Sequence, residues 1–299
     1  MSKKILFQFP GQGSQAVGMG TSLADAHPEA RAVFDEVNGA LGEDLFAMMK
    51  DGPEEDLRLT RNAQPALFAA SMAAFAVLRE ATGRDITDLA SFVAGHSLGE
   101  YSALAAAGSL SITDAARLLR LRGDSMQSAV PAGDGAMAAI LGAEEAVVDD
   151  IVAEAGSAGV IQFANDNAPG QIVLSGDVTA CAAAIDRAGD AGFKAKELVV
   201  AGAFHSSLMQ PAADAMAMCS QQHSFCSDCA WRTRKTVFVA ASAGAAPPSA
   251  ITSRPSITYE APRRLAVFAR LRAPPQSFSR AVMAVAVISL RLPDSYQRR

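Results

Sequence analysis

A serine inside a glycine motif is the strongest candidate for chemistry in this sequence. Residues 95–99 read GHSLG, which fits G-x-S-x-G with Ser97 at its centre. A nucleophile in this motif projects from a sharp turn between a strand and a helix, and Gly95 and Gly99 leave room for the chain to bend. The first N–H groups of the following helix point toward negative charge formed at the serine. We therefore predict that Ser97 is a nucleophile rather than a helix cap.

A serine nucleophile needs a base, and the sequence has four histidines. His96 adjoins Ser97 at the sharp turn, where neighbouring side chains diverge, so packing is its expected role. His27 lies at a helix boundary and is expected at the surface, and His223 lies in a C-terminal segment of different composition. His205 follows the last strand of a predicted insert, in a loop of the kind that often carries catalytic groups. From the residues alone, a base and a hydrogen-bonded loop histidine are equally supported at this position.

A second glycine-rich stretch follows the first apolar run of the chain. Gly11-x-Gly13-x-x-Ala16 loosely fits the dinucleotide-binding fingerprint. That site expects an acid about 20 residues further on, at the end of a second strand, whereas Asp35 and Glu36 lie inside a helical pattern. A phosphate-binding P-loop is excluded because no Gly-Lys-Ser/Thr occurs there.

These groups need a scaffold, and the hydrophobic pattern of the first 129 residues predicts an α/β fold. A buried strand is predicted over 3–9, and a second, short strand precedes the GHSLG turn. Helices are predicted over 14–24, over 28–41, over 65–81 with Pro65 at its start, directly after the GHSLG turn, and over 113–129.

The pattern changes after residue 130. Residues 135–202 read strand, helix, strand, strand, helix, strand, which is the ferredoxin-like split order. We therefore predict a hydrolase-like large α/β domain with a parallel sheet and an inserted ferredoxin-like small domain. The large domain comprises 1–129 and 201–218, and the insert comprises 130–200.

Composition predicts a cytoplasmic protein and marks a break near residue 218. The 299-residue chain is 50% hydrophobic, but it has no signal-peptide pattern at its start and no uninterrupted apolar run of about 18 residues. Its four cysteines do not suggest a disulfide framework. Residues 1–218 carry 14 basic and 28 acidic side chains, whereas residues 219–299 carry 12 and 3.

Residues 219–299 form no coherent pattern of elements, and only one of the 23 glycines lies there. We interpret this segment as an anomalous tail that comes from a shifted reading frame or an unrelated replacement. Cys219, His223, Cys226 and Cys229 contain a single C-x-x-C pair, so a zinc site is disfavoured. Nucleic-acid binding by the arginine-rich tail is equally disfavoured without a folded context.

Taken together, the motifs resemble those of the malonyl-CoA:acyl carrier protein transacylases, acyltransferases of fatty acid biosynthesis. The resemblance covers residues 3–217, with the motifs in the family's order, and it stops before the tail. The matching segments are FPGQGSQ at 9–15, QPA at 64–66, GHSLGEYSAL at 95–104, Arg122 in LLRLRGDSMQ, NAPGQIVLSG at 167–176 and GAFHSSLMQPAA at 202–213. The family's later strands, the residue that orients its histidine and its late glycine-rich loop are not found in residues 219–299.

The resemblance implies a two-step transfer. Ser97 would attack the thioester of malonyl-CoA with His205 as its base, and the malonyl-serine ester would then pass to the phosphopantetheine thiol of acyl carrier protein. The backbone N–H groups of Gln12 and Leu98 would form the oxyanion hole. The glycines that flank Gln12 would then let its backbone approach a thioester oxygen instead of a pyrophosphate.

The resemblance also implies how the substrate is selected. Arg122 would bind the free malonyl carboxylate through two hydrogen bonds. From the residues alone a solvated helix arginine is favoured there, because Arg117 and Arg120 are equally plausible partners for a carboxylate. Phe204 would crowd a branched methylmalonyl group, and Gln64 is expected in a supporting role.

The resemblance implies malonyl-CoA and an acidic acyl carrier protein as partners, with basic surface near the cleft. We expect a cytoplasmic monomer with no metal or redox cofactor, and neither nucleic acid nor membrane as a partner. Two alternatives stay open. A serine hydrolase or thioesterase would place an acid between serine and histidine in chain order, where Asp166 and Asp177 are available. An inactive relative that only binds the carrier protein is the other, because loss of the closing strands would expose the main sheet.

Overall fold

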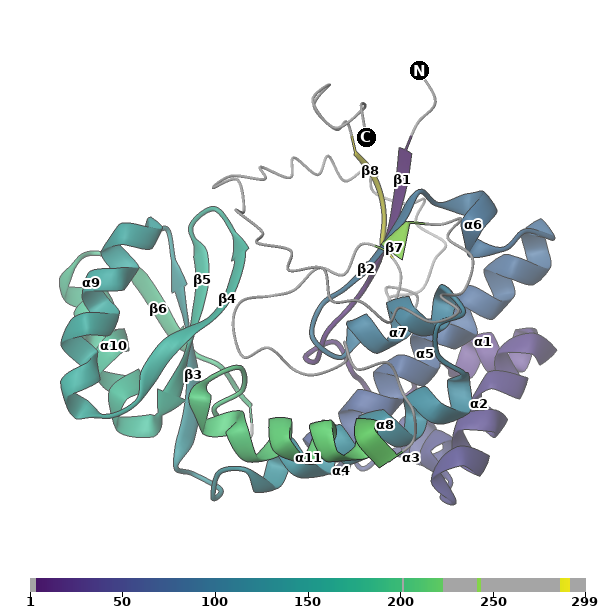
Figure 1. Cartoon of the computed structure of the whole chain (residues 1–299), viewed down its shortest axis with the longest axis horizontal. Coiled ribbons are helices and arrows are strands. Elements are labelled where there is room, and N and C mark those ends of the chain that lie inside the picture. Colours follow the sequence, from purple (N-terminus) through teal and green to yellow (C-terminus); the bar gives the residue numbers. More distant parts are fainter. Residues whose placement is uncertain (1–3, 201, 223–240, 243–285, 291–299) are drawn as a thin grey trace.

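A computed structural model describes residues 4–200, 202–222, 241–242 and 286–290, and two four-stranded sheets organise them (Figure 1). The first sheet has the strand order β7-β2-β1-β8 and the second β4-β5-β3-β6. None of the described helices is long and apolar enough to cross a membrane.

The first sheet contains the parallel strand pair that the sequence predicts. β1 (Lys4–Phe9) runs parallel to β2 (Phe92–Gly95), and Phe9 is the partner of Gly95 at the end of the register. β8 (Ala286–Leu290) pairs antiparallel with β1, and β7 (Ala241–Ser242) pairs antiparallel with β2. Both edges of this sheet therefore come from the tail, where the sequence pattern predicted no element.

Eight of the described helices pack beside the first sheet, to its right and below it in Figure 1. They are α1 (Thr21–Ala26), α2 (Pro28–Leu41), α3 (Leu45–Asp51), α4 (Glu54–Arg58), α5 (Thr60–Thr82), α6 (Ile86–Leu89), α7 (Gly99–Ala106) and α8 (Ile112–Ser128). Their apolar faces share one core with the strands, in which Phe9, Phe34, Phe68 and Leu119 are almost fully buried. The predicted bounds of α2 are confirmed, and those of α8 differ by one residue at each end.

The helix predicted over 14–24 is wrong for most of its length. Residues 17–20 form turns, and α1 begins only at Thr21. Gly18 and Gly20 have φ angles of 88° and 79°, in the left-handed region that a right-handed helix excludes. The Gly18 N–H donates to the carbonyl of Met49 at 2.7 Å, so a contact to α3 replaces the helical bond.

The predicted start of α5 at Pro65 is also wrong, since the helix begins at Thr60 and Pro65 lies inside it. A proline there has no N–H to donate to the carbonyl four residues earlier, which belongs to Arg61. The Arg120 guanidinium of α8 donates to that carbonyl at 2.8 Å instead. A side chain that is distant in the sequence thus satisfies the group that the proline leaves without its helical partner.

The second sheet has the element order that the sequence predicts for the insert. Its elements are β3 (Gly135–Leu141), α9 (Glu145–Ala155), β4 (Ile161–Ala168), β5 (Gln171–Asp177), α10 (Val178–Asp190) and β6 (Lys194–Glu197). All neighbouring strands are antiparallel. Ile140 packs in the core beneath α9 and α10, whereas Met137 on the opposite face packs with Met126 of α8 and Phe204. α11 (Gln210–Gln222) then returns along α8 (Figure 1).

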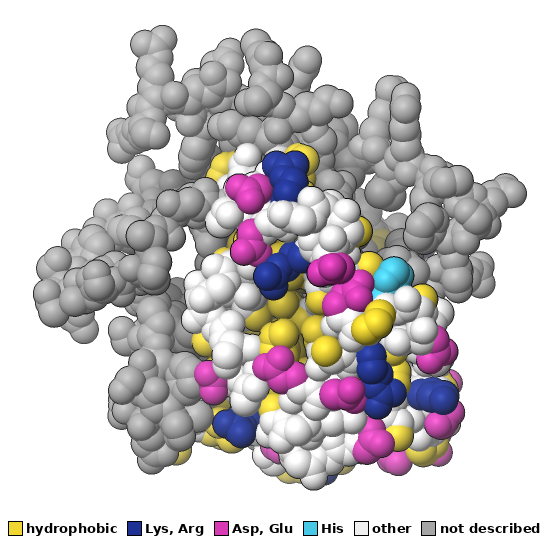
Figure 2. Space-filling model, turned by 90° about the vertical axis from the view of Figure 1, so that its right-hand side faces the viewer, with side chains coloured by type: hydrophobic (Ala, Val, Ile, Leu, Met, Phe, Trp, Pro, Cys, Tyr) yellow, Lys and Arg dark blue, Asp and Glu magenta, His cyan; other side chains and the backbone are white. Residues whose placement is uncertain are grey.

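Basic and acidic side chains are interspersed over the face of the molecule in Figure 2, with hydrophobic side chains between them. In the described part of this face they form no patch of a single sign.

Candidate active site

Ser97 occupies a strained turn between β2 and α7. Its φ angle of 55° is unusual for a residue with a side chain. A Cβ on Gly95 would lie 2.0 Å from the carbonyl of Gly99, and one on Gly99 would lie 2.4 Å from the carbonyl oxygen of Phe9. Both glycines are therefore required by close backbone approach, as the motif predicts.

His205 lies within hydrogen-bond distance of this serine. Its Nε2 is 3.1 Å from the Oγ of Ser97, although 108 residues separate the two in sequence. His205 itself has a φ angle of 64°. Its loop is held by Ser206 Oγ, which donates to the Ala203 carbonyl at 2.7 Å, and by the Ser207 N–H, which donates to Gln162 of β4 at 2.7 Å.

The His205 imidazole is uncharged near neutral pH. Burial lowers its pKa to about 3, and the positive charge of Arg122 and the proximity of the His96 imidazole act in the same direction. The ring is therefore neutral near pH 7 and can act as a base toward Ser97.

Arg122 meets the same serine from α8. Its side chain is 1% exposed, and its Nη2 donates to Ser97 Oγ at 3.1 Å. Its Nη1 donates to the side-chain oxygen of Gln64, whose own Nε2 lies 3.4 Å from the sulfur of Met126. Burial lowers the Arg122 pKa to about 10, so the guanidinium stays charged near pH 7.

The structure separates the three arginines that the sequence could not rank. Arg117 donates to the carbonyl of Ala40 at 3.2 Å, and Arg120 pairs with Glu43. Only Arg122 of the three bonds to Ser97.

The two backbone N–H groups of the expected oxyanion hole lie in adjoining segments. A Cβ on Gly11 would lie 2.3 Å from Nδ1 of His96, so the first glycine loop packs directly on the GHSLG turn. Leu98 is buried and forms the N-cap of α7. Among the described residues, no acceptor is bonded to the backbone N–H of Gln12 or of Leu98.

Asp35 and Glu36, the acids considered for a dinucleotide site, lie in α2 as expected.

Sequence reasoning missed three polar neighbours of the site, which are Glu100, Tyr101 and Asn165. Burial raises the pKa of Glu100, and the charge of Arg122 opposes that rise. The ring of Tyr101 lies 6.0 Å from Arg122 Cζ. Their spacing of three and four residues after Ser97 on a helix was the available signal. His96, expected only to pack, is also 3.5 Å from the Asn165 amide of β4, which no sequence spacing indicates.

Phe204 lies in the apolar cluster between the second sheet, α8 and α11, where it is 5% exposed.

Asp177, one of the acids considered for a hydrolase, accepts from the Val160 N–H at 2.6 Å, and Asp166 is exposed.

Four residues of the tail were considered as zinc ligands. The side chains of Cys219, His223, Cys226 and Cys229 lie outside the described part. Within it, no group of three or more His, Cys, Asp or Glu side chains is arranged to hold a metal ion.

Comparisons with known proteins give a consistent result. The family model described as the acyl transferase domain matches residues 6–245, and so extends into the tail. Among curated proteins, the malonyl CoA-acyl carrier protein transacylase of Bacillus subtilis is 50% identical over 215 residues, covering 71% of this chain and 66% of that protein. The protein of the same name from Escherichia coli K12 is 44% identical over 220 residues, covering 72% of this chain and 69% of that protein. The chain thus spans about two thirds of the length of these relatives.

Solved structures agree with the sequence comparison. The acyl-carrier-protein S-malonyltransferase of Bartonella henselae superposes with a TM-score of 0.71 at 49% identity, covering 74% of this chain and 70% of that one. A malonyl-transacylase solved in complex with its type II polyketide synthase acyl carrier protein gives a TM-score of 0.69 at 43% identity, covering 73% and 69%.

Proposed function

The chain belongs to the acyl transferase domain family, and from that premise we propose that it moves malonyl from malonyl-CoA to the phosphopantetheine thiol of acyl carrier protein, in fatty acid biosynthesis. One observation carries the proposal. Ser97 Oγ lies 3.1 Å from the His205 imidazole and 3.1 Å from the Arg122 guanidinium, so nucleophile, base and carboxylate-binding group meet at one atom. The curated relatives bear the name of this activity.

The reaction begins at Ser97. His205 Nε2 takes the hydroxyl proton as Oγ attacks the thioester carbonyl, and the same proton passes to the departing sulfur of coenzyme A. The malonyl group is then an ester of Ser97. His205 next takes the proton of the phosphopantetheine thiol, whose sulfur attacks the ester, and returns it to Ser97 Oγ as the malonyl group leaves.

The tetrahedral intermediate of each step carries negative charge on the former carbonyl oxygen. The N–H groups of Gln12 and Leu98 are the donors that we assign to it. Each such donor contributes about 3 kcal/mol to stabilising the transition state. Their lack of an acceptor among the described residues supports this role.

Arg122 supplies the preference for malonyl. A substrate carboxylate that accepts hydrogen bonds from Nη1 and Nη2 of Arg122 takes the Nη2 donor away from Ser97 Oγ. The lone pairs of the serine oxygen are then available for attack. An acetyl thioester has no carboxylate, so it neither binds the buried charge nor releases the serine. Phe204 is assigned the exclusion of branched acyl groups, and Gln64 holds the guanidinium in place.

We further infer that residues 130–200 are a ferredoxin-like insert in a hydrolase-like large domain formed by 1–129 and 201–218. The element order β3-α9-β4-β5-α10-β6 supports this division. A cytoplasmic monomer remains our proposal for the working state. Residues 219–299 remain assigned to a shifted frame or a replacement, and reading the encoding DNA in its other frames for a glycine-rich, acidic C-terminus is the test.

The transfer is tested with radioactive malonyl-CoA. We expect a stoichiometric burst of coenzyme A release, label on the peptide that contains Ser97, and loss of both in Ser97→Ala. A Ser128→Ala variant, which changes an exposed serine of α8, serves as the matched control and should keep the label. A folded protein that takes up no label indicates the inactive relative instead.

Adding acyl carrier protein separates transfer from hydrolysis. We expect label to leave Ser97 faster when carrier is present and to appear on its thiol. Steady release of free malonate at a rate independent of carrier would refute the transferase and favour the serine hydrolase.

A further inference from the structure

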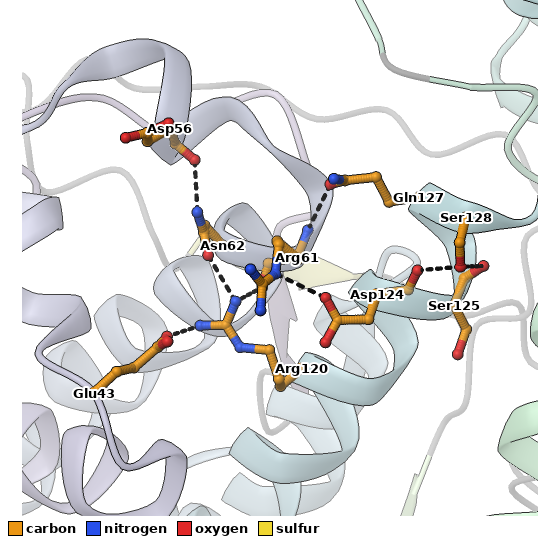
Figure 3. Close-up of polar contacts among 9 residues, drawn as sticks. All are labelled: Glu43, Asp56, Arg61, Asn62, Arg120, Asp124, Ser125, Gln127 and Ser128. Atoms are coloured by element: carbon orange, nitrogen blue, oxygen red, sulfur yellow. Dashed lines mark hydrogen bonds and ion pairs between the residues drawn. The ribbon is translucent and has the colours of Figure 1, made fainter. Parts of the chain in front are cut away.

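Arg120 connects α8 to the first turn of α5. Its Nη1 donates to the carbonyl of Arg61 at 2.8 Å and to the side-chain oxygen of Asn62 at 2.6 Å, and its Nη2 pairs with Glu43 (Figure 3). The Arg120 side chain is 13% exposed and that of Glu43 is 41% exposed, so Arg120 is the more buried partner of this ion pair.

The carbonyl that Arg120 binds is the one that Pro65 cannot serve. In a regular helix the N–H of residue 65 would donate to the carbonyl of Arg61. Without that bond the first turn of α5 has no intrahelical tie at this point. Gln64 follows this turn directly and precedes Pro65, and it is the direct partner of the Arg122 guanidinium.

Three further contacts fix this turn against α8. Gly123 lies so close that a Cβ there would be 2.6 Å from the Cα of Arg61. The Arg61 guanidinium donates to Asp124 at 2.8 Å, and the Arg61 N–H donates to the Gln127 side chain at 3.4 Å (Figure 3).

Arg120 and Arg122 lie on opposite sides of α8. Two residues along an α-helix correspond to a rotation of about 200°. Arg120 therefore grips the start of α5 from one side, while Arg122 meets Gln64, directly after that turn, at the buried side. Any shift of this turn along α8 changes the position of the amide that orients Arg122.

We propose that Arg120 is a positioning residue for malonyl selection: by taking the place of the N–H that Pro65 lacks, it sets the register of α5 on α8 that brings Gln64 to the Arg122 guanidinium. The proposal rests on the proposed function, since it concerns the site that binds the malonyl carboxylate. It concerns carboxylate recognition and not the chemistry at Ser97.

The first test compares Arg120→Met with Arg117→Met. Arg117 is the matched control because it also lies on α8 and also donates to a backbone carbonyl, but its acceptor, Ala40, belongs to α2. For each variant kcat and KM are measured with malonyl-CoA and with acetyl-CoA, on protein whose active fraction is counted by labelling Ser97. In Arg120→Met we expect the malonyl-to-acetyl ratio of kcat/KM to fall about tenfold through KM for malonyl-CoA, and in Arg117→Met we expect no change.

Pro65→Ala provides the second test. Alanine restores an N–H that can donate to the Arg61 carbonyl, so Arg120→Met should reduce the ratio less in this background than in the wild type. Arg120→Lys should recover part of the ratio, because its ammonium can reach one of the three acceptors but not all of them. The Arg120→Lys variant also keeps the test decisive if Arg120→Met does not fold, because a ratio equal to that of the wild type would then overturn the proposal.

The outcomes separate this inference from the proposed function. A wild type that prefers malonyl-CoA, together with an Arg120→Met variant of unchanged ratio, overturns the inference alone. Equal losses with both acyl groups also overturn it, because they indicate a merely structural arginine. A folded wild type with no malonyl preference overturns the proposed function, and the inference with it.

Discussion

The α5–α8 interface has two sides, and each holds one arginine of α8. On the outer side Arg120 pairs with the carboxylate of Glu43. On the buried side the Nη1 of Arg122 donates to the amide oxygen of Gln64. An acid and an amide both accept hydrogen bonds, but only the acid adds negative charge.

Under the proposed function, the difference teaches how one helix can use two arginines, one for structure and one for recognition. Glu43 compensates the outer charge, so Arg120 acts as a tie between helices. Gln64 orients the inner guanidinium without adding a charge, which leaves Arg122 able to attract a substrate carboxylate. Its neighbour Glu100 has a raised pKa from burial, which favours the uncharged form of that acid.

Removing the inner arginine should have the largest effect. Arg122→Met deletes two charged hydrogen bonds to the carboxylate, each worth about 1.5–3 kcal/mol, so kcat/KM for malonyl-CoA should fall about 100-fold or more. Acetyl transfer should change far less. Initial rates with both substrates check this, and a parallel loss for acetyl-CoA would assign Arg122 to the chemistry instead of to selection.

Making the inner side resemble the outer side should have the next largest effect. In Gln64→Glu a carboxylate faces Arg122, competes with the substrate and lowers malonyl kcat/KM about tenfold or more. Gln127→Glu is the control, because it places the same change where the Arg61 N–H is the donor. If both variants lose malonyl activity equally, the contrast between the two sides is not what selects the substrate.

The difference between Arg122 and Arg120 should also appear in the pH dependence of the reaction rate. The charge of Arg122 lowers the His205 pKa, so Arg122→Met should raise that pKa. Protonated His205 cannot act as a base, so the acidic limb of the rate profile for acetyl transfer should move to higher pH. Arg120→Met should leave the limb in place, and profiles of kcat/KM for the two variants and the wild type distinguish these results.

Removing the outer acid should have the smallest effect. The Glu43 side chain is 41% exposed, so Glu43→Gln should lower the free energy of unfolding by less than about 1 kcal/mol. The malonyl-to-acetyl ratio should stay near that of the wild type, because the Arg120 bonds to α5 remain. Denaturant unfolding and the two rates measure this, and a collapse of the ratio would contradict a purely supporting role for Glu43.

Several elements could be predicted because their signals are local. The bounds of α2 and the strand-helix order from β3 to β6 follow from hydrophobic period and turn residues. The start of α5 could not be predicted in this way. Pro65 suggests a helix start, and only the Arg120 side chain, 59 residues away from Arg61, makes the earlier start acceptable.

The tail shows a different limit of sequence reasoning. Its composition indicates no element, yet β7 and β8 pair with β2 and β1. Strand pairing depends on a partner that is distant in the chain, so a short segment carries little signal of its own.

By itself the sequence determined the turn that displays Ser97, because the backbone of Gly95 approaches that of Gly99 within five residues. It also determined the set of candidates, including His205 and three arginines on one helix. Only the tertiary structure decided which arginine reaches the serine and whether the histidine does. The physical reason is that the backbone contacts of a tight turn are local, whereas a 3.1 Å approach across 108 residues depends on how the helices and both sheets pack together.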